Sequence, residues 1–193
     1  QVNAWGTATG GEFQPLQLRS AEAAVIVSGG CVIHAPCDGH QVYALDLFSG
    51  SKLWEIPRSN TLYVAGIWRD RVLLIQDQLV TCVQATDGAK LWASPIALTG
   101  LGRVAGRGVR NGGRYYLPMT SQEILEIDLE TGGIIDRIRV KEPLGNLVAT
   151  ADQLISLSPV ELAAFSIRDR LRAEIDLEFA QNVGSSGRLQ REG

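Results

Sequence analysis

No stretch of the chain approaches the roughly 18 consecutive apolar residues that a membrane-spanning helix needs, so we expect no membrane span. An excess of charge of one sign is also missing, because charged residues make up an ordinary 20% of the 193 residues and the net charge is −3. The chain therefore lacks a broad positive field that would attract nucleic acid or an anionic membrane, and we expect neither as a partner. Apolar residues make up 45%, which is ordinary for a folded domain and excludes a disordered chain.

Cysteine is equally scarce. The three thiols, Cys31, Cys37 and Cys82, are an odd number that cannot all pair within one chain, so they do not identify the redox compartment. No phosphate-binding G-x-x-x-x-G-K-[ST] sequence occurs, and the glycines and arginines between residues 100 and 114 predict bends with a solvated basic face. The first residues show no signal-peptide pattern, but because the chain begins with Gln1 instead of Met we expect a processed or excised segment, with room for a targeting signal in the missing part.

What the sequence does contain is a repeated hairpin. Residues 43–54 read Y-A-L-D-L-F-S-G-S-K-L-W, which is an alternating strand, a turn closed by Gly50, and a second strand that ends in Trp54. Residues 81–92 read T-C-V-Q-A-T-D-G-A-K-L-W, and residues 126–136 read E-I-D-L-E-T-G-G-I-I-D. The turn glycines Gly50, Gly88 and Gly132 are therefore 38 and 44 residues apart. Periods in this range indicate stacked or radially arranged supersecondary units.

The repeat divides the chain into units of short strands. We expect a loop or the edge of a preceding unit at residues 1–20, full units at residues 21–57, 58–95 and 103–140, and a partial unit at residues 144–165. Each full unit is predicted to be a four-stranded meander, with the last strand of the second unit at residues 90–93 and the first strand of the third at residues 103–109. The edges of such meanders must be covered, and radial packing against like units covers them.

The composition changes at residues 166–193. The sequence I-R-D-R-L-R-A-E-I-D-L-E-F alternates like a strand, yet its apolar residues also recur at helical i, i+4 spacing. We favour a helix over residues 166–180, because Ser166 and Asp169 resemble a capping box and opposite charges follow four residues apart. The remaining residues are predicted to be a mobile tail.

The repeated phrase D-x-x-[ST]-G-x-x-x-W resembles the repeat of quinoprotein-like β-propellers. The residues that carry it are Asp46, Gly50 and Trp54 in the first unit, Gly88 and Trp92 in the second, and Asp128 and Gly132 in the third. The resemblance covers residues 21–165 and implies an all-β propeller with about three and a half to four four-stranded blades, its tryptophans packed between neighbouring blades. Complete propellers of this family have about seven or eight blades, so we expect a fragment of a larger ring; a closed four-bladed ring is the alternative.

Cysteine and histidine occur three residues apart at Cys31, His34, Cys37 and His40, and these are the residue types of zinc sites. Residues three apart on a strand point to opposite faces, which argues against a metal ion. We favour a small buried Cys31 followed by turn residues that meet solvent. A disulfide between Cys31 and Cys37 is not expected either, because five intervening residues of strand and turn need not bring their Cα atoms within bonding range.

Asp46 and Asp128 occupy matching positions, and paired carboxylates can perform acid–base catalysis. A structural role is the simpler interpretation, because both stand where a strand meets its turn and can accept backbone N–H bonds there, while Gln84 fills the same place in the second unit. Trp54 and Trp92 lie in the repeat itself, so we expect packing between blades instead of a stacking platform for sugars or bases.

The resemblance implies two functions. Quinone-dependent alcohol and sugar dehydrogenases of this family use calcium with an acidic cluster and an adjacent cysteine pair, and neither pattern occurs here. We therefore predict a non-catalytic scaffold without a cofactor, similar to family members that help assemble outer-membrane β-barrels. Its partners would be proteins and the remaining blades of a larger propeller, in the periplasm or at the outer membrane. The alternative is a dehydrogenase fragment whose catalytic residues lie elsewhere, and a weaker third possibility is a carbohydrate-binding or lyase propeller.

Overall fold

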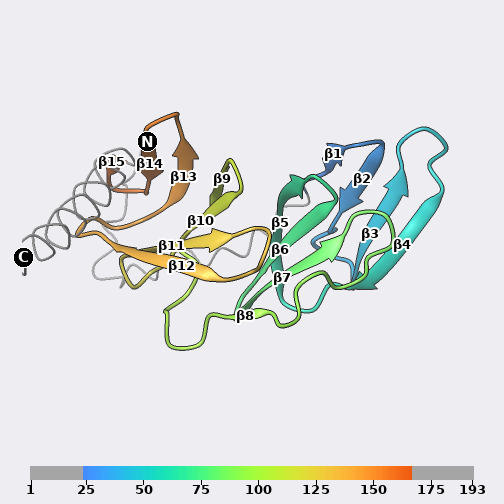
Figure 1. Cartoon of the computed structure of the whole chain (residues 1–193), viewed down its shortest axis with the longest axis horizontal. Coiled ribbons are helices and arrows are strands. Elements are labelled where there is room, and N and C mark those ends of the chain that lie inside the picture. The colour runs from blue at the N-terminus through green and yellow to red at the C-terminus, as the bar shows by residue number, and fades with distance from the viewer. Residues whose placement is uncertain (1–23, 167–193) are drawn as a thin grey trace, which may run out of the picture.

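The structure is a computed structural model that describes residues 24–166, and within them fifteen short strands form four antiparallel sheets (Figure 1). The loop expected at residues 1–20 and the helix and tail expected beyond residue 166 lie outside the described residues. Ser166 itself, the expected helix cap, is instead the last residue of a strand. No helix within residues 24–166 has the length and apolarity to cross a membrane.

Every sheet is a meander whose strands pair in chain order. Sheet 1 contains β1 (Ile26–Ser28), β2 (Cys31–His34), β3 (Gln41–Asp46) and β4 (Lys52–Pro57). Sheet 2 contains β5 (Thr61–Trp68), β6 (Arg71–Gln76), β7 (Leu79–Gln84) and β8 (Ile96–Ala97). Sheet 3 contains β9 (Val109–Asn111), β10 (Arg114–Pro118), β11 (Glu123–Asp128) and β12 (Ile134–Arg139). Sheet 4 contains β13 (Asn146–Ala149), β14 (Gln153–Leu157) and β15 (Leu162–Ser166).

The sheets lie side by side in chain order, with sheet 1 at the right of Figure 1 and sheet 4 at the left. The first strands of neighbouring sheets contact each other, β1 with β5 and β9 with β13. The predicted all-β propeller is confirmed as a partial one: an open row of blades with three four-stranded sheets and one three-stranded sheet in the described part of the chain.

The hydrophobic core is divided into clusters that lie between successive sheets. The centre of sheet 2 shows how this arises from the sequence. Val72 and Leu74 on β6 pack toward sheet 1, whereas Leu73 and Ile75 on the same strand pack toward sheet 3, and all four are at most 4% exposed. A strand covered on both faces needs no polar alternation, so it reads as a continuous apolar run.

Two strand predictions are wrong. Residues 90–93 contribute only an isolated bridge between Lys90 and Val83, and the fourth strand of sheet 2 is β8, beyond Pro95, which has no N–H to donate to a ladder. Residues 103–109 form only one bridge, Val104 with Met119, before β9 begins. This segment bends because it passes very close to the backbone that leads into sheet 4. A Cβ added to Gly106 would lie under 3.0 Å from backbone atoms of Gly145 and Asn146.

Candidate functional site

The turns between the third and fourth strands are held by aspartates. Asp46 Oδ1 accepts the backbone N–H of Phe48 at 3.1 Å and of Ser49 at 2.7 Å, and the latter bond lowers the pKa of Asp46. Asp128 Oδ1 accepts the N–H of Glu130 at 2.8 Å and of Thr131 at 2.9 Å. The two carboxylates lie in separate sheets, so they are placed to fix turns and not to act together on a substrate.

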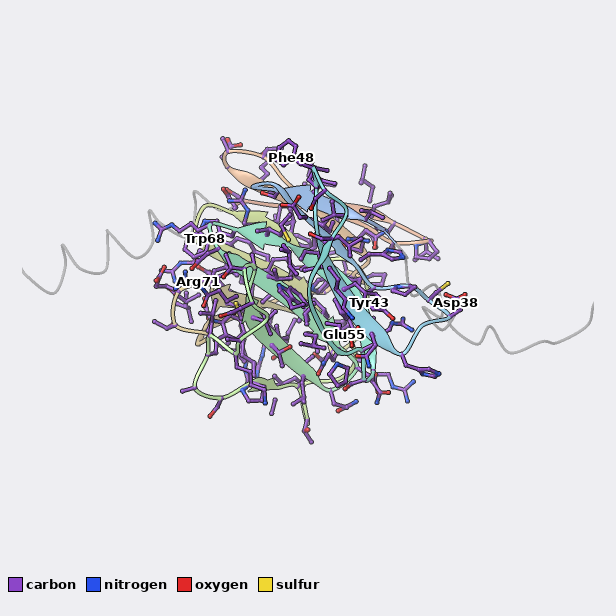
Figure 2. All side chains as sticks on the ribbon, turned by 90° about the vertical axis from the view of Figure 1, so that its right-hand side faces the viewer. Asp38, Tyr43, Phe48, Glu55, Trp68 and Arg71 are labelled. Carbon is purple, nitrogen blue, oxygen red and sulfur yellow. The ribbon has the colours of Figure 1, made fainter. Side chains whose placement is uncertain are left out.

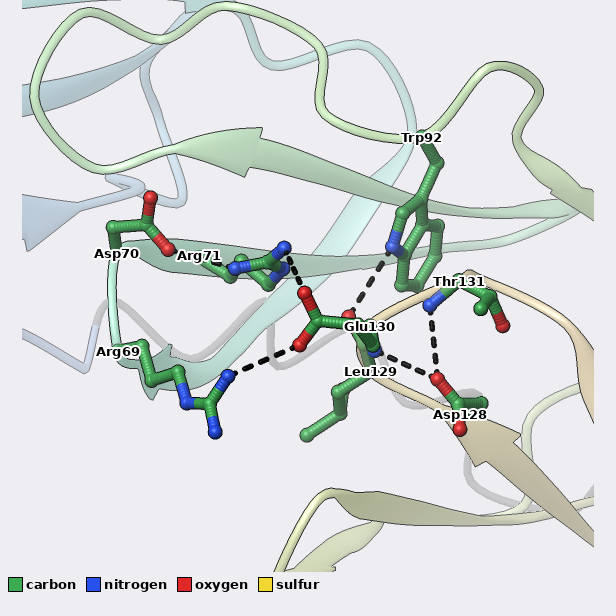
Figure 3. Close-up of polar contacts among 8 residues, drawn as sticks. All are labelled: Arg69, Asp70, Arg71, Trp92, Asp128, Leu129, Glu130 and Thr131. Carbon is green, nitrogen blue, oxygen red and sulfur yellow. Dashed lines mark hydrogen bonds and ion pairs between the residues drawn. The ribbon is translucent and has the colours of Figure 1, made fainter.

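The tryptophans connect each sheet to the next. The Trp54 indole N–H donates to the carbonyl of Ala85 at 2.8 Å, which is three residues before Gly88. The Trp92 indole donates to Leu129 at 3.4 Å, three residues before Gly132 (Figure 3). A Cβ added to Gly88 would lie 3.0 Å from the Trp54 ring. Each indole therefore rests on the turn glycine of the following sheet.

Gly50 is the exception. Its φ of 68° is close to the 73° of Gly88 and the 76° of Gly132, yet nothing lies within 4 Å of an added Cβ. Sheet 1 is the first sheet in the described residues, so within them no preceding sheet supplies a tryptophan to this turn. The same turn is thus seen with and without an indole on it.

The four cysteine and histidine candidates for a metal site do not converge. Cys31 is buried, its Sγ points to the carbonyl of Ala85 at 3.7 Å, and burial raises the pKa of its thiol. His34 lies on the opposite face of sheet 1, while Cys37 and His40 are exposed in the following turn. Within the described part of the chain, no three His, Cys, Asp or Glu side chains are grouped to hold a metal ion.

A cluster of arginine and tryptophan spans sheets 2 and 3, and we call it the Trp68 ridge: Trp68, Arg69, Arg71 and Glu130 (Figure 3 shows its charged members). The guanidinium carbons of Arg69 and Arg71 lie 4.5 and 5.6 Å from the centroid of the Trp68 ring. Both arginines also donate to Glu130 in the β11–β12 turn, at 3.2 and 2.7 Å. The ridge combines an aromatic ring with cations at the junction of two sheets.

Sequence reasoning missed the Trp68 ridge. It considered the basic run further along the chain, but those arginines are dispersed: Arg114 pairs with Glu126 and Asp128, and Arg107 stacks on Tyr63. The available signal was the sequence W-R-D-R at residues 68–71, which places two arginines around a two-residue turn. Glu130 could not be assigned to it, because Arg71 and Glu130 are 59 positions apart in the chain and only the packing of the sheets brings them together.

Beside the ridge lies a small pocket with mostly apolar walls, which Trp68, Arg71 and Arg110 line together with Ala65, Ile67, Leu73, Cys82, Tyr115 and Leu129. Burial raises the pKa of the Cys82 thiol to about 12, so this cysteine stays protonated and is a poor nucleophile. Tyr63 and Tyr115 share a hydroxyl contact of 3.3 Å beneath it, and burial raises the pKa of both. The neutral groups and the exposed Arg69 guanidinium of this junction suit binding better than proton transfer.

Comparisons with known proteins agree with this geometry. BamB from Moraxella catarrhalis has a TM-score of 0.62 and 20% sequence identity over 75% of this chain and 46% of its own. The computationally designed proteins Ika4 and Ika8 each have a TM-score of 0.61, at 13% and 15% identity, over 75% of this chain and 90% and 45% of theirs. At these identities the likeness shows the fold. This chain thus aligns with less than half the length of the Moraxella protein.

A search of the curated proteins finds no match. A family model described as outer membrane protein assembly factor BamB matches residues 76–173. That segment includes the Trp92 turn contact and the Glu130 end of the Trp68 ridge. Since the match extends over half of the 193 residues, the chain belongs to the family of the outer membrane protein assembly factor BamB.

Proposed function

We propose that this chain is a non-catalytic scaffold module that binds a protein partner during outer membrane protein assembly, in the periplasm or at the outer membrane. Membership of the BamB family supports the assembly role. The chemistry of the junction supports binding over catalysis, because burial keeps the Cys82 thiol and the Tyr63 and Tyr115 hydroxyls protonated. A module of this kind needs a surface that a partner can recognise.

The observation that carries the proposal is the Trp68 ridge. Tryptophan and arginine are the residues most enriched at the energetic centres of protein interfaces. The Arg69 side chain is 66% exposed, and its bond to Glu130 uses only part of a guanidinium that carries five N–H donors. A partner carboxylate can therefore be bound there while an apolar side chain covers the adjacent pocket. We assign the ridge to a partner segment that combines acidic and apolar residues.

Charge reversal tests the ridge. The wild type, Arg69→Glu and the control Arg103→Glu, an exposed arginine on the glycine-rich segment, are crosslinked to detergent-solubilised outer membranes and the products identified by mass spectrometry. We expect a component of the β-barrel assembly machinery to crosslink to the wild type and to the control. Arg69→Glu should lower that yield roughly tenfold, the equivalent of about 1.4 kcal/mol. Equal yields from both variants would remove the ridge from the interface.

A second assay tests the absence of catalysis. The purified chain is mixed with pyrroloquinoline quinone and calcium, and quinone binding and dye-linked alcohol oxidation are measured. We expect neither. Turnover that depends on both additions would overturn the scaffold proposal and favour the dehydrogenase alternative.

A further inference from the structure

Exposed apolar side chains are concentrated at the two ends of the row of sheets. Among residues 24–166, ten large apolar side chains are exposed, and nine of them belong to sheets 1 and 4 or their turns. At sheet 1 they are Val25, Val27, Leu47, Phe48 and Leu53, and at sheet 4 they are Val148, Leu157, Val160 and Leu162. The tenth is Ile135 in sheet 3. Large apolar patches on the surface of a folded protein mark interaction sites.

In sheets 2 and 3, the face that points toward the preceding sheet is buried. The equivalent face of sheet 1 is open. Val32 pairs with Leu45 directly inside the turn that begins at Asp46. The pairs at the same register are Val72 with Val83 in sheet 2 and Tyr115 with Ile127 in sheet 3. Those four residues are at most 4% exposed, whereas Val32 and Leu45 are only partly buried and their neighbour Val27 is 55% exposed. At this register sheet 1 therefore has the apolar surface of an internal sheet without its neighbour, and His34, Lys52 and Glu55 surround it on the same face.

Figure 2 looks onto this end of the molecule. Tyr43 lies on the sheet that faces the viewer, and Phe48, 88% exposed, lies at the tip of the turn between β3 and β4. Exposed apolar side chains at this end of the core are unfavourable in water, because each of them forgoes the free energy that burial would supply.

Sheet 4 has a matching open face at the other end. Val148, Ile155 and Ala164 are aligned across its three strands, and Leu157 pairs with Leu162 in the next row of the same face. The opposite face packs on sheet 3 through Leu147, Leu154 and Phe165. Asn146 completes the row of Leu157, and Gln153 pairs with Ser166 at the end of this face, so sheet 4 has an apolar centre on both of its faces.

The internal junctions indicate what can cover these faces. The junction of sheets 3 and 4 is closed by Tyr116, Ile124, Leu147 and Leu154, so a junction does not require a tryptophan. The same row of sheets covers 90% of Ika4 but only 45% of Ika8 and 46% of the Moraxella protein. Four sheets in a row are thus nearly the whole chain of Ika4 but about half of the chain of Ika8 and of the Moraxella protein. Two such rows together have about the length of either longer chain.

We propose that two copies of this chain associate head to tail, with sheet 4 of each copy packed on sheet 1 of the other. The two contacts are equivalent by a twofold axis, so the association closes into one ring and leaves neither apolar face open. The proposal does not depend on the partner assigned to the Trp68 ridge, which lies at the junction of sheets 2 and 3 and stays exposed in such a ring.

Sedimentation equilibrium over a wide concentration range tests the proposal on the whole chain. We expect a dimer of twice the 20.9 kDa chain mass. Val27→Asp and Leu157→Asp each place an uncompensated carboxylate in both contacts, so each should raise the dissociation constant roughly hundredfold or more. Ile135→Asp is the matched control, because Ile135 is 47% exposed but lies on sheet 3, and its dimer should be unchanged. Near-ultraviolet circular dichroism checks that every variant is folded.

Three results would overturn the proposal. A wild-type chain that is monomeric at all concentrations would mean that its own terminal segments cover the faces. A dimer that Val27→Asp dissociates but Leu157→Asp does not would be a contact between like sheets. Species that grow with concentration beyond the dimer would be an open chain that fails to close.

Discussion

The three turn glycines form a natural substitution series. Gly50, Gly88 and Gly132 have φ values of 68°, 73° and 76°, so replacement by alanine imposes the same left-handed backbone cost, about 1–2 kcal/mol, at each of them. They differ in what the new methyl group would meet. Nothing lies within 4 Å at Gly50, the Trp54 ring lies at 3.0 Å from the Gly88 position, and the Trp92 ring lies closer still to the Gly132 position.

The expected losses of unfolding free energy follow from that order. Gly50→Ala should lose only the backbone contribution of about 1–2 kcal/mol. Gly132→Ala adds overpacking against the Trp92 ring, typically about 1–3 kcal/mol, for a total of about 2–5 kcal/mol. Gly88→Ala should fall between them, because its contact of 3.0 Å is relieved by a small shift of the Trp54 ring.

Urea unfolding monitored by circular dichroism measures these losses. All three substitutions are made in the Val27→Asp background, which the dimer proposal expects to be monomeric, so that no second copy covers Gly50. Adding Trp92→Leu should make room for the new methyl at Gly132, so that Trp92→Leu and Gly132→Ala together cost at least about 1 kcal/mol less than their sum. Equal losses at all three glycines, or additivity of that pair, would refute the role assigned to the indoles.

Three further predictions concern single side chains. Trp54→Phe removes the indole bond to a buried carbonyl and should cost about 1–2 kcal/mol in urea unfolding, more than the same change at the longer Trp92 bond; equal costs would contradict this. The Thr131 N–H lowers the pKa of Asp128, so its stabilisation is present above the ordinary carboxyl pKa and is lost as the pH falls through the lowered one. Asp128→Asn should therefore reduce the fall in thermal stability below about pH 4. A variant whose melting temperature falls with pH as steeply as that of the wild type would contradict the stabilising role of the Asp128 hydrogen bonds. A thiol reagent should modify exposed Cys37 rapidly and Cys82, whose pKa is about 12, only after unfolding; rapid native labelling of Cys82 would contradict its burial.

The hairpin repeat was readable from sequence because its information is local. Asp46, Gly50 and Trp54 fall within nine residues, and each has a conformational or packing reason for its position. The period then implied copies of one unit, which is the arrangement of sheets 1 to 3.

The errors arose where tertiary contacts decide. The residues before β9 read as a strand, but they bend to pass against the approach to sheet 4, a requirement that lies some 40 residues away in the chain. The fourth strand of sheet 2 was placed at Trp92, which is instead committed to the turn of sheet 3. The Trp68 ridge depends on Glu130 in a different sheet, so periodicity along one strand could not reveal it.

The direction of the indole contacts has a consequence for synthesis on the ribosome. Trp54 packs on residues 85–88 and Trp92 on residues 129–132. Each tryptophan can therefore make this contact only after about 30 to 40 further residues have been translated. The tryptophan of a newly synthesised blade is therefore exposed to solvent until the next blade has been synthesised and packs against it. Pausing or truncation between blades would leave that ring exposed to chaperones and proteases, at a position that moves stepwise along the growing polypeptide.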